Sequence, residues 1–386
     1  CTMVFGDNGG ATGWLIGEEN KGLACMFTMM NNARLGVALQ GVAIAERAYQ
    51  QALGYARERK QGKAPGSAAA MSPIIEHPDV KRMLVDMRSK AAAARAICYV
   101  TAAALDRHHR ETDPARKKAA HEEASLLTPV AKAFGTDIGI EVASTGVQVH
   151  GGMGFVEETG AAQHYRDARI LAIYEGTNGI QSIDLVMRKL PLSGGETVKA
   201  AIARYRAAAE AVAKLNDPAF GKAGQRLREA VDSLERATAW MLSTMNAAPA
   251  DALAGATPYL RLFGLASGGA FLAEAALASS GTGARGDRRR GLGQRRLPRR
   301  GGVTMTDHIE ITRRDGILAV RMNRPDKKNA LTSAMYAAMA EAVLSADGDS
   351  SVGAILFLGL PGAFRQGTTS RISRASPRAA TSARTC

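Results

Sequence analysis

Apolar residues recur at helical spacing between residues 30 and 60. Leu35, Leu39, Val42, Tyr49 and Leu53 follow one another at steps of 4, 3, 7 and 4 residues. At the period of an α-helix, these steps place the five side chains on one stripe. The pattern predicts a long amphipathic helix whose stripe packs into a core.

A second helix is predicted after a loop rich in glycine and proline between residues 62 and 78. Pro78 suits the first position of a helix, where the missing N–H costs nothing. The apolar face that follows, with i, i+3, i+4, i+7 spacing, consists of Val80, Met83, Leu84 and Met87. Cys98 continues this face, so we expect it to be a small core residue.

Helical periodicity continues from about residue 119 to 147 and from 177 to 190. Amphipathic helices of this length bury their faces against one another. We therefore expect residues 26–190 to form a helical bundle and the fold class to be mainly α.

After a linker at residues 191–195, an alanine-rich helical pattern resumes over residues 197–278. Breaks are expected at Pro218 and between residues 246 and 258, where helix-breaking residues accumulate. This region is predicted to be a second helical unit that packs against the bundle.

The first residues have the composition of a β-hairpin. Residues 2–5 and 12–16 predict two strands, with a turn at residues 7–10. Two strands alone do not make a stable sheet. We expect residues 1–25 to be the remnant of a middle β domain and the chain, which begins with Cys1, to be a fragment.

Residues 305–364 predict a short α/β fragment. Its expected elements are a hairpin of residues 309–312 and 317–322, a helix capped by Thr332 or Ser333 with Met335, Met339 and Ala342 on one face, and a strand at 352–360.

The net charge of +14 is concentrated in two short segments. Residues 281–302 contribute +7 and residues 365–386 contribute +5, which leaves +2 for the rest. We interpret residues 279–304 as a flexible Arg/Gly-rich linker or as a frame-shifted translation, and residues 365–386 as a disordered basic tail. A nucleic-acid partner is not expected, because it would depend on these segments alone.

Four cysteines, Cys1, Cys25, Cys98 and Cys386, lie far apart without metal-ligand spacing. This argues against a disulfide framework and against a zinc site. No export signal is recognisable at the start, and uncharged stretches such as residues 262–273 are too short to cross a bilayer. We expect a cytoplasmic protein with no membrane span and no bound metal.

A first candidate for chemistry is the glycine-rich stretch Gln148–Phe155, with Gly151, Gly152 and Gly154. Closely spaced glycines let a backbone approach a ligand and offer N–H groups to a phosphate or a ring. A turn that merely ends a helix has the same composition. Because a helix precedes it rather than a strand, it is not a dinucleotide fingerprint.

A second candidate is the stretch Ile173–Gln181. Thr177 can cap a helix, and Glu175 would then lie just outside that helix in apolar surroundings. A carboxylate in such a site can act as a general base. Alternatively, Glu175 only complements the helix dipole.

Four motifs, in this order and spacing, resemble the C-terminal part of the acyl-CoA dehydrogenases, in particular a subgroup with an additional C-terminal helical domain. The motifs are Met30–Leu35, Tyr55–Gln61, Gln148–Phe155 and Arg166–Thr177. The resemblance implies FAD-dependent α,β-dehydrogenation of an acyl-CoA thioester. It implies that Glu175 removes the α-proton while a hydride leaves the β-carbon for the flavin. It also implies substrate contacts by Arg34, by Gly176 and by Asn31, which replaces the family's usual aspartate.

The resemblance further implies FAD contacts, some of them to the FAD of a neighbouring subunit. The positions concerned are Arg59, Gln61, His77, Gln148, Val149, His150, Gly151, Gly152, Thr177 and Gly179. Electron transfer flavoprotein would be the electron acceptor, and the intact parent would be a homo-oligomer. Without the family's N-terminal region, the chain alone is expected to bind FAD weakly or not at all and to be inactive.

Residues 305–364 resemble the start of a crotonase-superfamily protein, through Met322–Leu331 and Gly362–Phe364. The resemblance stops in mid-motif at Arg365, so this piece is expected to be inert. A dehydrogenase end joined by a frame slip to a hydratase start would produce such a chain, and an intact frame on resequencing would refute that hypothesis. The alternative function is a non-catalytic helical scaffold whose basic linker binds nucleic acid or anionic surfaces.

Overall fold

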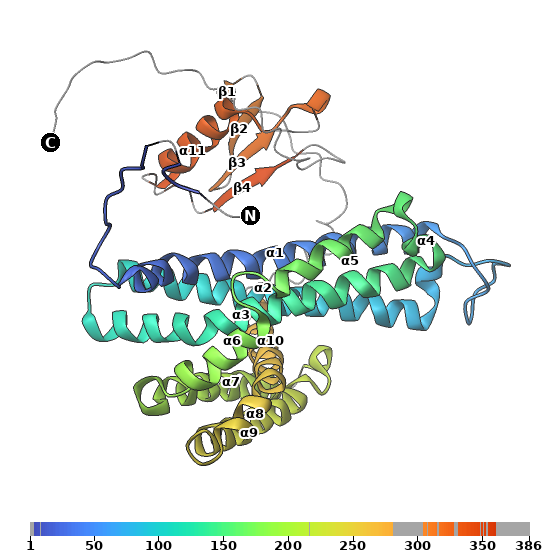
Figure 1. The fold of residues 1–386 in the computed structure, drawn as a ribbon. Coiled ribbons are helices and arrows are strands. Elements are labelled where there is room, and N and C mark those ends of the chain that lie inside the picture. Colours follow the sequence, from blue (N-terminus) through green and yellow to red (C-terminus); the bar gives the residue numbers. More distant parts are fainter. Residues whose placement is uncertain are drawn as a thin grey trace. The chain divides into compact units, whose positions relative to one another are not determined.

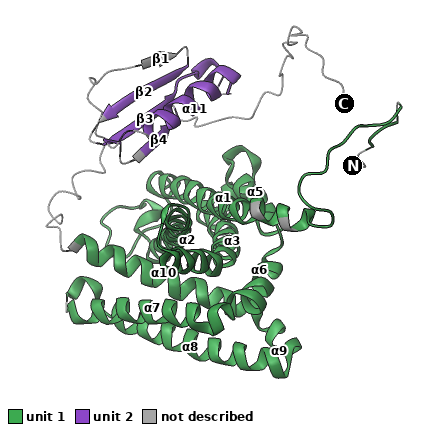
Figure 2. Cartoon of the chain, turned by 90° about the vertical axis from the view of Figure 1, so that its left-hand side faces the viewer, with its two compact units in different colours: residues 1–286 green, residues 287–386 purple. Residues whose placement is uncertain are grey.

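The computed structural model describes residues 4–7, 9–215 and 217–280, and residues 304–359 except 307, 315, 328–330, 348, 350 and 353. The chain divides into two compact units, residues 1–286 and 287–386 (Figure 2). The basic segments 281–302 and 365–386, and the motif Gly362–Phe364, lie outside the described residues, so the interpretations given to them remain predictions.

Three long helices form the predicted bundle in the first unit: α1 (Gly22–Glu58), α2 (Pro78–Arg110) and α3 (Pro114–His150) (Figure 1). Pro78 is the first residue of α2, as predicted. At the start of α3, the Asp113 carboxylate accepts the N–H of Arg116 at 2.8 Å. This cap explains why α3 begins five residues before the predicted start at residue 119.

The contact between α1 and α3 is closer than the sequence pattern predicts. A Cβ atom added to Gly41 would lie 2.3 Å from the carbonyl oxygen of Gly135. One added to Gly139 would lie 3.0 Å from the carbonyl oxygen of Gly41. The two backbones therefore touch at a glycine seam, which we define as Gly41, Gly135 and Gly139.

The predicted apolar stripe of α1 is partly wrong for the same reason. Leu39 is 38% exposed, and Tyr49 and Leu53 are only partly buried. The stripe that enters the core instead consists mainly of small residues: Leu35, Ala38, Val42, Ala45, Ala48 and Ala52. Small side chains face α3 because larger ones would hold the two helices apart.

Shorter helices follow α3: α4 (Gly152–Phe155), α5 (Ala161–Arg169) and α6 (Asn178–Asp184). The helix predicted over residues 177–190 is confirmed, with a π-helical turn over Leu185–Lys189. Sequence periodicity did not predict α4 and α5, because each is too short to show a repeating apolar face.

The second helical unit consists of α7 (Glu196–Leu215), α8 (Ala223–Ala247), α9 (Pro249–Ala254) and α10 (Ala256–Ser280). The break at Pro218 is confirmed, since a short 3₁₀ turn occupies Pro218–Phe220. The second break is narrower than predicted, because α9 and the start of α10 lie within it. Tyr205 packs edge-on against Phe263 and Phe271 in the core of this unit.

One helix in the described part of the chain, Ala256–Ser279 of α10, is long and apolar enough to cross a membrane, with a mean hydropathy of 1.4. The sequence argument missed it because Arg261 and Glu274 interrupt the uncharged stretch. Its aromatic residues Phe263 and Phe271 are at most 4% exposed, and α10 packs against α2, α3, α7 and α8. We interpret α10 as a core helix, and the expected lack of a membrane span stays a prediction.

The predicted hairpin at the N-terminus is not found. No strand occurs among residues 4–7 and 9–20, and Phe5, Trp14 and Ile16 are 79–88% exposed. Two strands need a third strand or a packed helix to cover an apolar face, and the described structure supplies neither here. The described part of residues 1–25 therefore contains no β element, and α1 already begins at Gly22.

The second compact unit of the chain, which is distinct from the second helical unit, contains a four-stranded sheet. Its strands follow the order β1 (Thr304–Thr306), β2 (Ile309–Arg314), β3 (Ile317–Met322) and β4 (Ala354–Leu358). Strands β1 to β3 are antiparallel, and β4 is parallel to β3. The predicted hairpin and the last strand are confirmed, whereas β1 was not predicted.

Helix α11 (Ser333–Asp347) packs on this sheet. Thr332 caps it as predicted, since its Oγ1 accepts the N–H of Met335 at 3.2 Å. The side chains of Met335 and Ala342 enter the core of the unit, with Met339 packed against it. The predicted apolar face of this helix is therefore confirmed.

Cys98, predicted to be a core residue, is 1% exposed on α2, and burial raises the pKa of its thiol to about 12. The thiolate is the reactive form of cysteine. We expect iodoacetamide at neutral pH to alkylate the exposed Cys25 of the native chain but not Cys98, and to alkylate both in guanidinium. Peptide mass spectrometry measures this. Equal labelling of the two thiols in the native chain would contradict the burial.

Candidate active site

Glu175 has an unusual backbone conformation at the start of α6. Its φ is 57°, and that of the following Gly176 is 83°, so both lie in the left-handed region. For a non-glycine residue this conformation costs about 1–2 kcal/mol. Thr177 then caps α6, because its Oγ1 accepts the N–H of Ile180 at 3.3 Å. The predicted cap is confirmed, and Glu175 lies half-buried immediately outside the helix.

A lysine of α3 binds this turn. Lys132 Nζ donates to the carbonyl oxygen of Gly176 and to Oδ1 of Asn178, each at 2.9 Å. Gln181 Nε2 also donates to the Gly176 carbonyl, at 3.3 Å. The left-handed segment is thus tied to α3 and to the first turn of α6.

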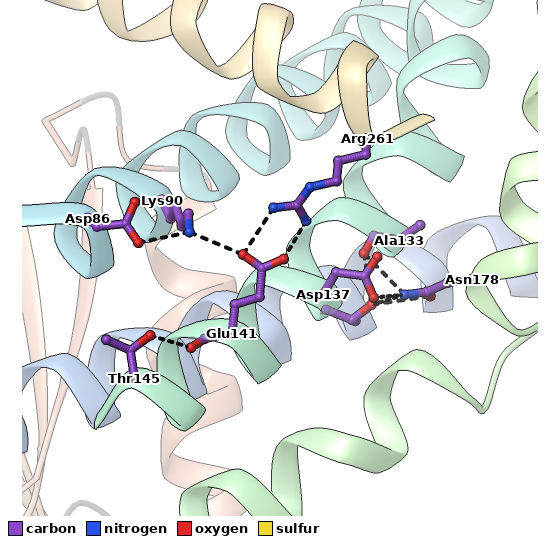
Figure 3. Close-up of polar contacts among 9 residues, drawn as sticks. Asp86, Lys90, Ala133, Asp137, Glu141, Thr145, Asn178 and Arg261 are labelled. Carbon is purple, nitrogen blue, oxygen red and sulfur yellow. Dashed lines mark hydrogen bonds and ion pairs between the residues drawn. The ribbon is translucent and has the colours of Figure 1, made fainter. Parts of the chain in front are cut away.

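Asn178 is the second anchor of the turn, and Figure 3 shows its amide directed at α3. Its Nδ2 donates to Asp137 Oδ1 at 2.7 Å and to the carbonyl oxygen of Ala133 at 3.2 Å. Burial raises the pKa of Asp137, although the hydrogen bond from Asn178 works in the opposite direction. Asn178 therefore joins the entrance of α6 to the middle of α3.

One turn further along α3, a charged cluster joins the second helical unit to the bundle. Arg261 of α10 binds the carboxylate of Glu141 (Figure 3). Lys90 Nζ of α2 lies 3.2 Å from Oε2 of the same carboxylate and also pairs with Asp86. Burial alone would raise the pKa of Glu141, but the bonds from Arg261 and Lys90 outweigh it and lower this pKa. The cluster fixes α10 beside the segment of α3 that holds Asn178.

Arg34 of α1 also lies at this site. It is 5% exposed, and its NH1 is 3.6 Å from an oxygen of Asp184. Its NH2 is 3.8 Å from the position that a Cβ on Gly176 would occupy. Among the described residues, the buried Arg34 Nε and Gln181 Oε1 have no hydrogen-bond partner. These two polar atoms remain available beside the Glu175 turn, while Asn31, on the same helix, is exposed.

A second group of predicted residues meets at the other end of the bundle, where α1 ends and α2 begins. The ring Nε2 of His77 lies 2.8 Å from the carbonyl oxygen of Gln61. The neighbouring Arg59 is exposed at the end of α1. The predicted cofactor residues Gln61 and His77, at the two ends of the loop between α1 and α2, are therefore in contact, although sixteen positions separate them in the sequence.

The glycine-rich stretch lies at this same end. The His150 ring stacks on Tyr55 with centroids 4.4 Å apart, and its Nδ1 is 2.7 Å from the carbonyl oxygen of Gly146. Val149 and His150 are buried by these contacts, whereas Gln148, Gly151 and Gly152 are exposed. We infer that the two buried side chains support the turn and that the exposed residues carry any ligand contact.

The two groups lie far apart within a single chain. Lys132, which binds the Glu175 turn, precedes His150 by eighteen positions on α3. At the helical rise this is about 27 Å. Figure 1 likewise shows α6 near the middle of the bundle and α4 at its end. The expectation that the glycine-rich stretch contacts a cofactor of a neighbouring subunit stays a prediction.

A cavity of about 540 Å³ lies elsewhere, between α3 and α7, and does not include Glu175. Its charged residues are already paired: Glu122 accepts from Ser193 and Thr197, and Glu123 binds Arg204. The cavity therefore offers less polar chemistry than the Glu175 turn, where two buried atoms are unpartnered.

Sequence reasoning missed the residues that hold the turn. They are Lys132, Thr136, Asp137, Asn178 and Gln181. One signal was present: Thr128, Lys132 and Thr136 recur every four residues within residues 126–136, a stretch that is otherwise apolar. This spacing places polar groups on one stripe that enters the core and requires partners there.

The conformation of Gly176 gives a testable consequence. In Gly176→Ala the new Cβ would lie 2.9 Å from Gln181 Nε2 at a φ of 83°. We expect the free energy of unfolding to fall by about 1–2 kcal/mol. Gly179→Ala is the control, since its Cβ would meet only Thr177 Oγ1, at 3.8 Å. Denaturant unfolding followed by circular dichroism measures both, and equal stabilities would contradict the strained turn.

Comparisons with known proteins agree with this fold. Residues 20–190 match the family model "Acyl-CoA dehydrogenase, C-terminal domain", and residues 196–296 match "Acetyl-CoA dehydrogenase C-terminal like". Residues 312–384 match "Enoyl-CoA hydratase/isomerase". The last two matches extend beyond residues 278 and 364, where the sequence argument had ended the corresponding regions.

Among curated proteins, the chain is 48% identical to 3-methylmercaptopropionyl-CoA dehydrogenase from Ruegeria pomeroyi, over 70% of this chain and 47% of that protein. It is 35% identical to the caffeyl-CoA reductase-Etf complex subunit CarC from Acetobacterium woodii, over 44% of this chain and 39% of that protein. The chain thus spans less than half the length of these relatives.

Among solved structures, an acyl-CoA dehydrogenase complexed with FAD from Bacillus anthracis matches with a TM-score of 0.54 and 22% identity. The match covers 69% of this chain and 46% of that one, and it shows the shared helical fold. Together, the helical fold and these matches show that residues 20–190 are similar to the C-terminal domain of the acyl-CoA dehydrogenases and that residues 196–296 are similar to the C-terminal extension found in such proteins.

Proposed function

We propose that residues 20–280 supply the catalytic base and part of the binding surface of an FAD-dependent dehydrogenase that converts an acyl-CoA thioester to the enoyl-CoA. Glu175 is the base. The observation that carries this proposal is its left-handed backbone at the entrance of a capped helix, with a φ of 57°. Conformations that cost free energy persist where neighbouring structure holds them, and such residues cluster at active sites.

The reaction needs a base beside a weakly acidic carbon. The α-proton of a thioester becomes removable only when the carbonyl oxygen accepts hydrogen bonds as negative charge develops. Glu175 can accept the proton on its carboxylate, and a backbone N–H of the same turn can donate to the thioester oxygen. Both functions require the turn to be rigid, which Lys132 and Asn178 provide through their bonds to it.

When bound, FAD would supply the acceptor for the hydride that leaves the β-carbon, so that two electrons and two hydrogens would be removed in total. The residues present fit this group. Arg59 is an exposed cation suited to a pyrophosphate, and Gln61 and His77 lie next to it. Thr177 and Gly179 would contact the flavin near Glu175, and the exposed Gln148, Gly151 and Gly152 would hold the cofactor of a neighbouring subunit.

Several finer statements belong to this proposal. The electron acceptor is electron transfer flavoprotein, supported by the relative in an Etf complex. The protein works as a homo-oligomer, supported by the distance between the two residue groups on α3. Its location in the cytoplasm and its role in a β-oxidation type of fatty acid metabolism rest on the sequence alone. The substrate contacts are Arg34, Asn31 and Gly176, supported by the unpartnered Arg34 Nε beside the turn.

The test uses a chimaera, in which the N-terminal half of 3-methylmercaptopropionyl-CoA dehydrogenase precedes residues 20–386 of this chain. The chimaera and the chain itself are incubated with FAD, 3-methylmercaptopropionyl-CoA or butyryl-CoA, and a ferrocenium dye. We expect the FAD-loaded chimaera to form the enoyl-CoA and the chain alone to form none. An FAD-loaded chimaera that leaves both thioesters unchanged would contradict the proposal.

The scaffold hypothesis makes a different prediction for the same samples. It requires tight, salt-sensitive binding of the chain to nucleic acid or anionic vesicles, lost on deletion of residues 281–302, and it assigns no role to Glu175. No contact among the described residues favours it.

A further inference from the structure

Lys132 is a buried cation that takes no direct part in the proposed chemistry. It is 0% exposed, in the middle of α3. An ammonium group in such a place requires strong partners. Its two acceptors are neutral oxygens, the Gly176 carbonyl and Asn178 Oδ1, both at 2.9 Å. A charged donor makes each of these bonds stronger than a neutral donor would.

These two acceptors lie on either side of Thr177, directly after Glu175. The chain is therefore fixed to α3 at positions 176 and 178, the two neighbours of the helix cap Thr177. Left-handed residues at 175 and 176 relax to ordinary backbone conformations unless contacts on the following residues prevent it. Lys132 supplies such contacts to both anchors at once.

We propose that Lys132 is a positioning residue, which holds Glu175 in its left-handed conformation by donating to Gly176 and Asn178. This inference rests on the proposed role of Glu175 as the base, but its test does not depend on turnover. The hydrogen bonds of Lys132 go to Gly176 and Asn178 and not to Glu175, so it acts through the two residues that flank Thr177.

The charge on Lys132 is sensitive to its surroundings. The ionisable groups that face it are Asp137 on its own helix, Arg34 on α1 and Glu175 on the turn. Burial, assisted by Arg34, lowers the pKa of Lys132 to about 8, although Asp137 and Glu175 act to raise it. The hydrogen bonds to Gly176 and Asn178 are therefore charge-assisted at neutral pH and lose that charge in mildly alkaline solution.

A spectroscopic test uses the 386-residue chain labelled with carbonyl-¹³C glycine and ¹⁵N threonine, which selects Gly–Thr pairs in the NMR spectrum. The signal that disappears in Gly176→Ala belongs to the Gly176 carbonyl. In the wild type this signal is expected to titrate with a midpoint near pH 8, the pKa of its donor. In Lys132→Met it is expected to shift and to lose the titration.

A second measurement reports on order in the turn. At neutral pH, Lys132→Met is expected to raise hydrogen exchange of the peptide that spans residues 174–182 by about tenfold, the effect of losing a charge-assisted bond. The control is Lys90→Met, which removes a lysine that pairs with Asp86 and Glu141 and leaves the turn untouched. It is expected to leave exchange of that peptide unchanged.

The outcomes are decisive in each case. A Gly176 carbonyl signal that shows no titration at any alkaline pH at which the wild-type chain stays folded overturns the proposal even if Lys132→Met fails to fold. Exchange of residues 174–182 within twofold of the wild type in a folded Lys132→Met chain overturns it as well. If Glu175 were not the catalytic base, only assays of the chimaera would reveal it. A failure of the proposed function is therefore distinguishable from a failure of the proposed role of Lys132.

Discussion

Glu175→Gln is expected to lower the kcat of the FAD-loaded chimaera by about 10²- to 10⁴-fold, the usual contribution of a positioned general base. Glutamine has the size of glutamate, so the turn and its bonds from Lys132 and Gln181 to the Gly176 carbonyl remain. KM should change little, because the lost function is proton removal. Steady-state dye reduction with butyryl-CoA measures both constants.

The matched control is Glu210→Gln, which replaces an exposed glutamate of α7. It should leave kcat within twofold of the unsubstituted chimaera. If Glu175→Gln behaved in the same way as this control, Glu175 would have no part in the chemistry. A loss of FAD together with activity would instead indicate that the substitution had damaged the fold.

Gly41→Ala is expected to lower the free energy of unfolding by about 3 kcal/mol or more, because overpacking against a rigid contact is costly. The added Cβ would lie 2.3 Å from a backbone oxygen of Gly135, and a backbone atom cannot turn aside as a flexible side chain can. The α1–α3 contact would have to open along the glycine seam. Urea unfolding of the full chain, followed by far-ultraviolet circular dichroism, measures the loss.

The control is the same substitution on the same helix at Gly54, where no atom lies within 4 Å of the added Cβ. There alanine has the better helix propensity, so stability should rise by about 0.5–1 kcal/mol. Opposite signs at the two positions are the expected result. Similar effects at Gly41 and Gly54 would show that α1 and α3 do not meet at the glycine seam.

The elements that the sequence predicted correctly are those with local signals. Pro78 and Thr177 begin their helices through their own backbone and side-chain chemistry, and Thr332 does so in the second unit. The position of Glu175 outside a helix followed from the same local argument. These predictions needed no knowledge of which segments meet in space.

The errors come from long-range contacts. The face of α1 was assigned from its large side chains, whereas the close approach of α3 selects alanines and Gly41. The strands expected near Trp14 have no partner strands to pair with in the described structure. Lys132 lies forty-four positions before Gly176, so its bond to the turn could not be inferred from either local pattern.

Proton removal by Glu175 is tested most directly by solvent deuterium exchange at C2 of butyryl-CoA, with the FAD-loaded chimaera in D₂O and no electron acceptor. The account predicts that the unsubstituted chimaera introduces deuterium at C2 and that Glu175→Gln does so no faster than buffer. Exchange by Glu175→Gln at the rate of the unsubstituted chimaera would contradict it.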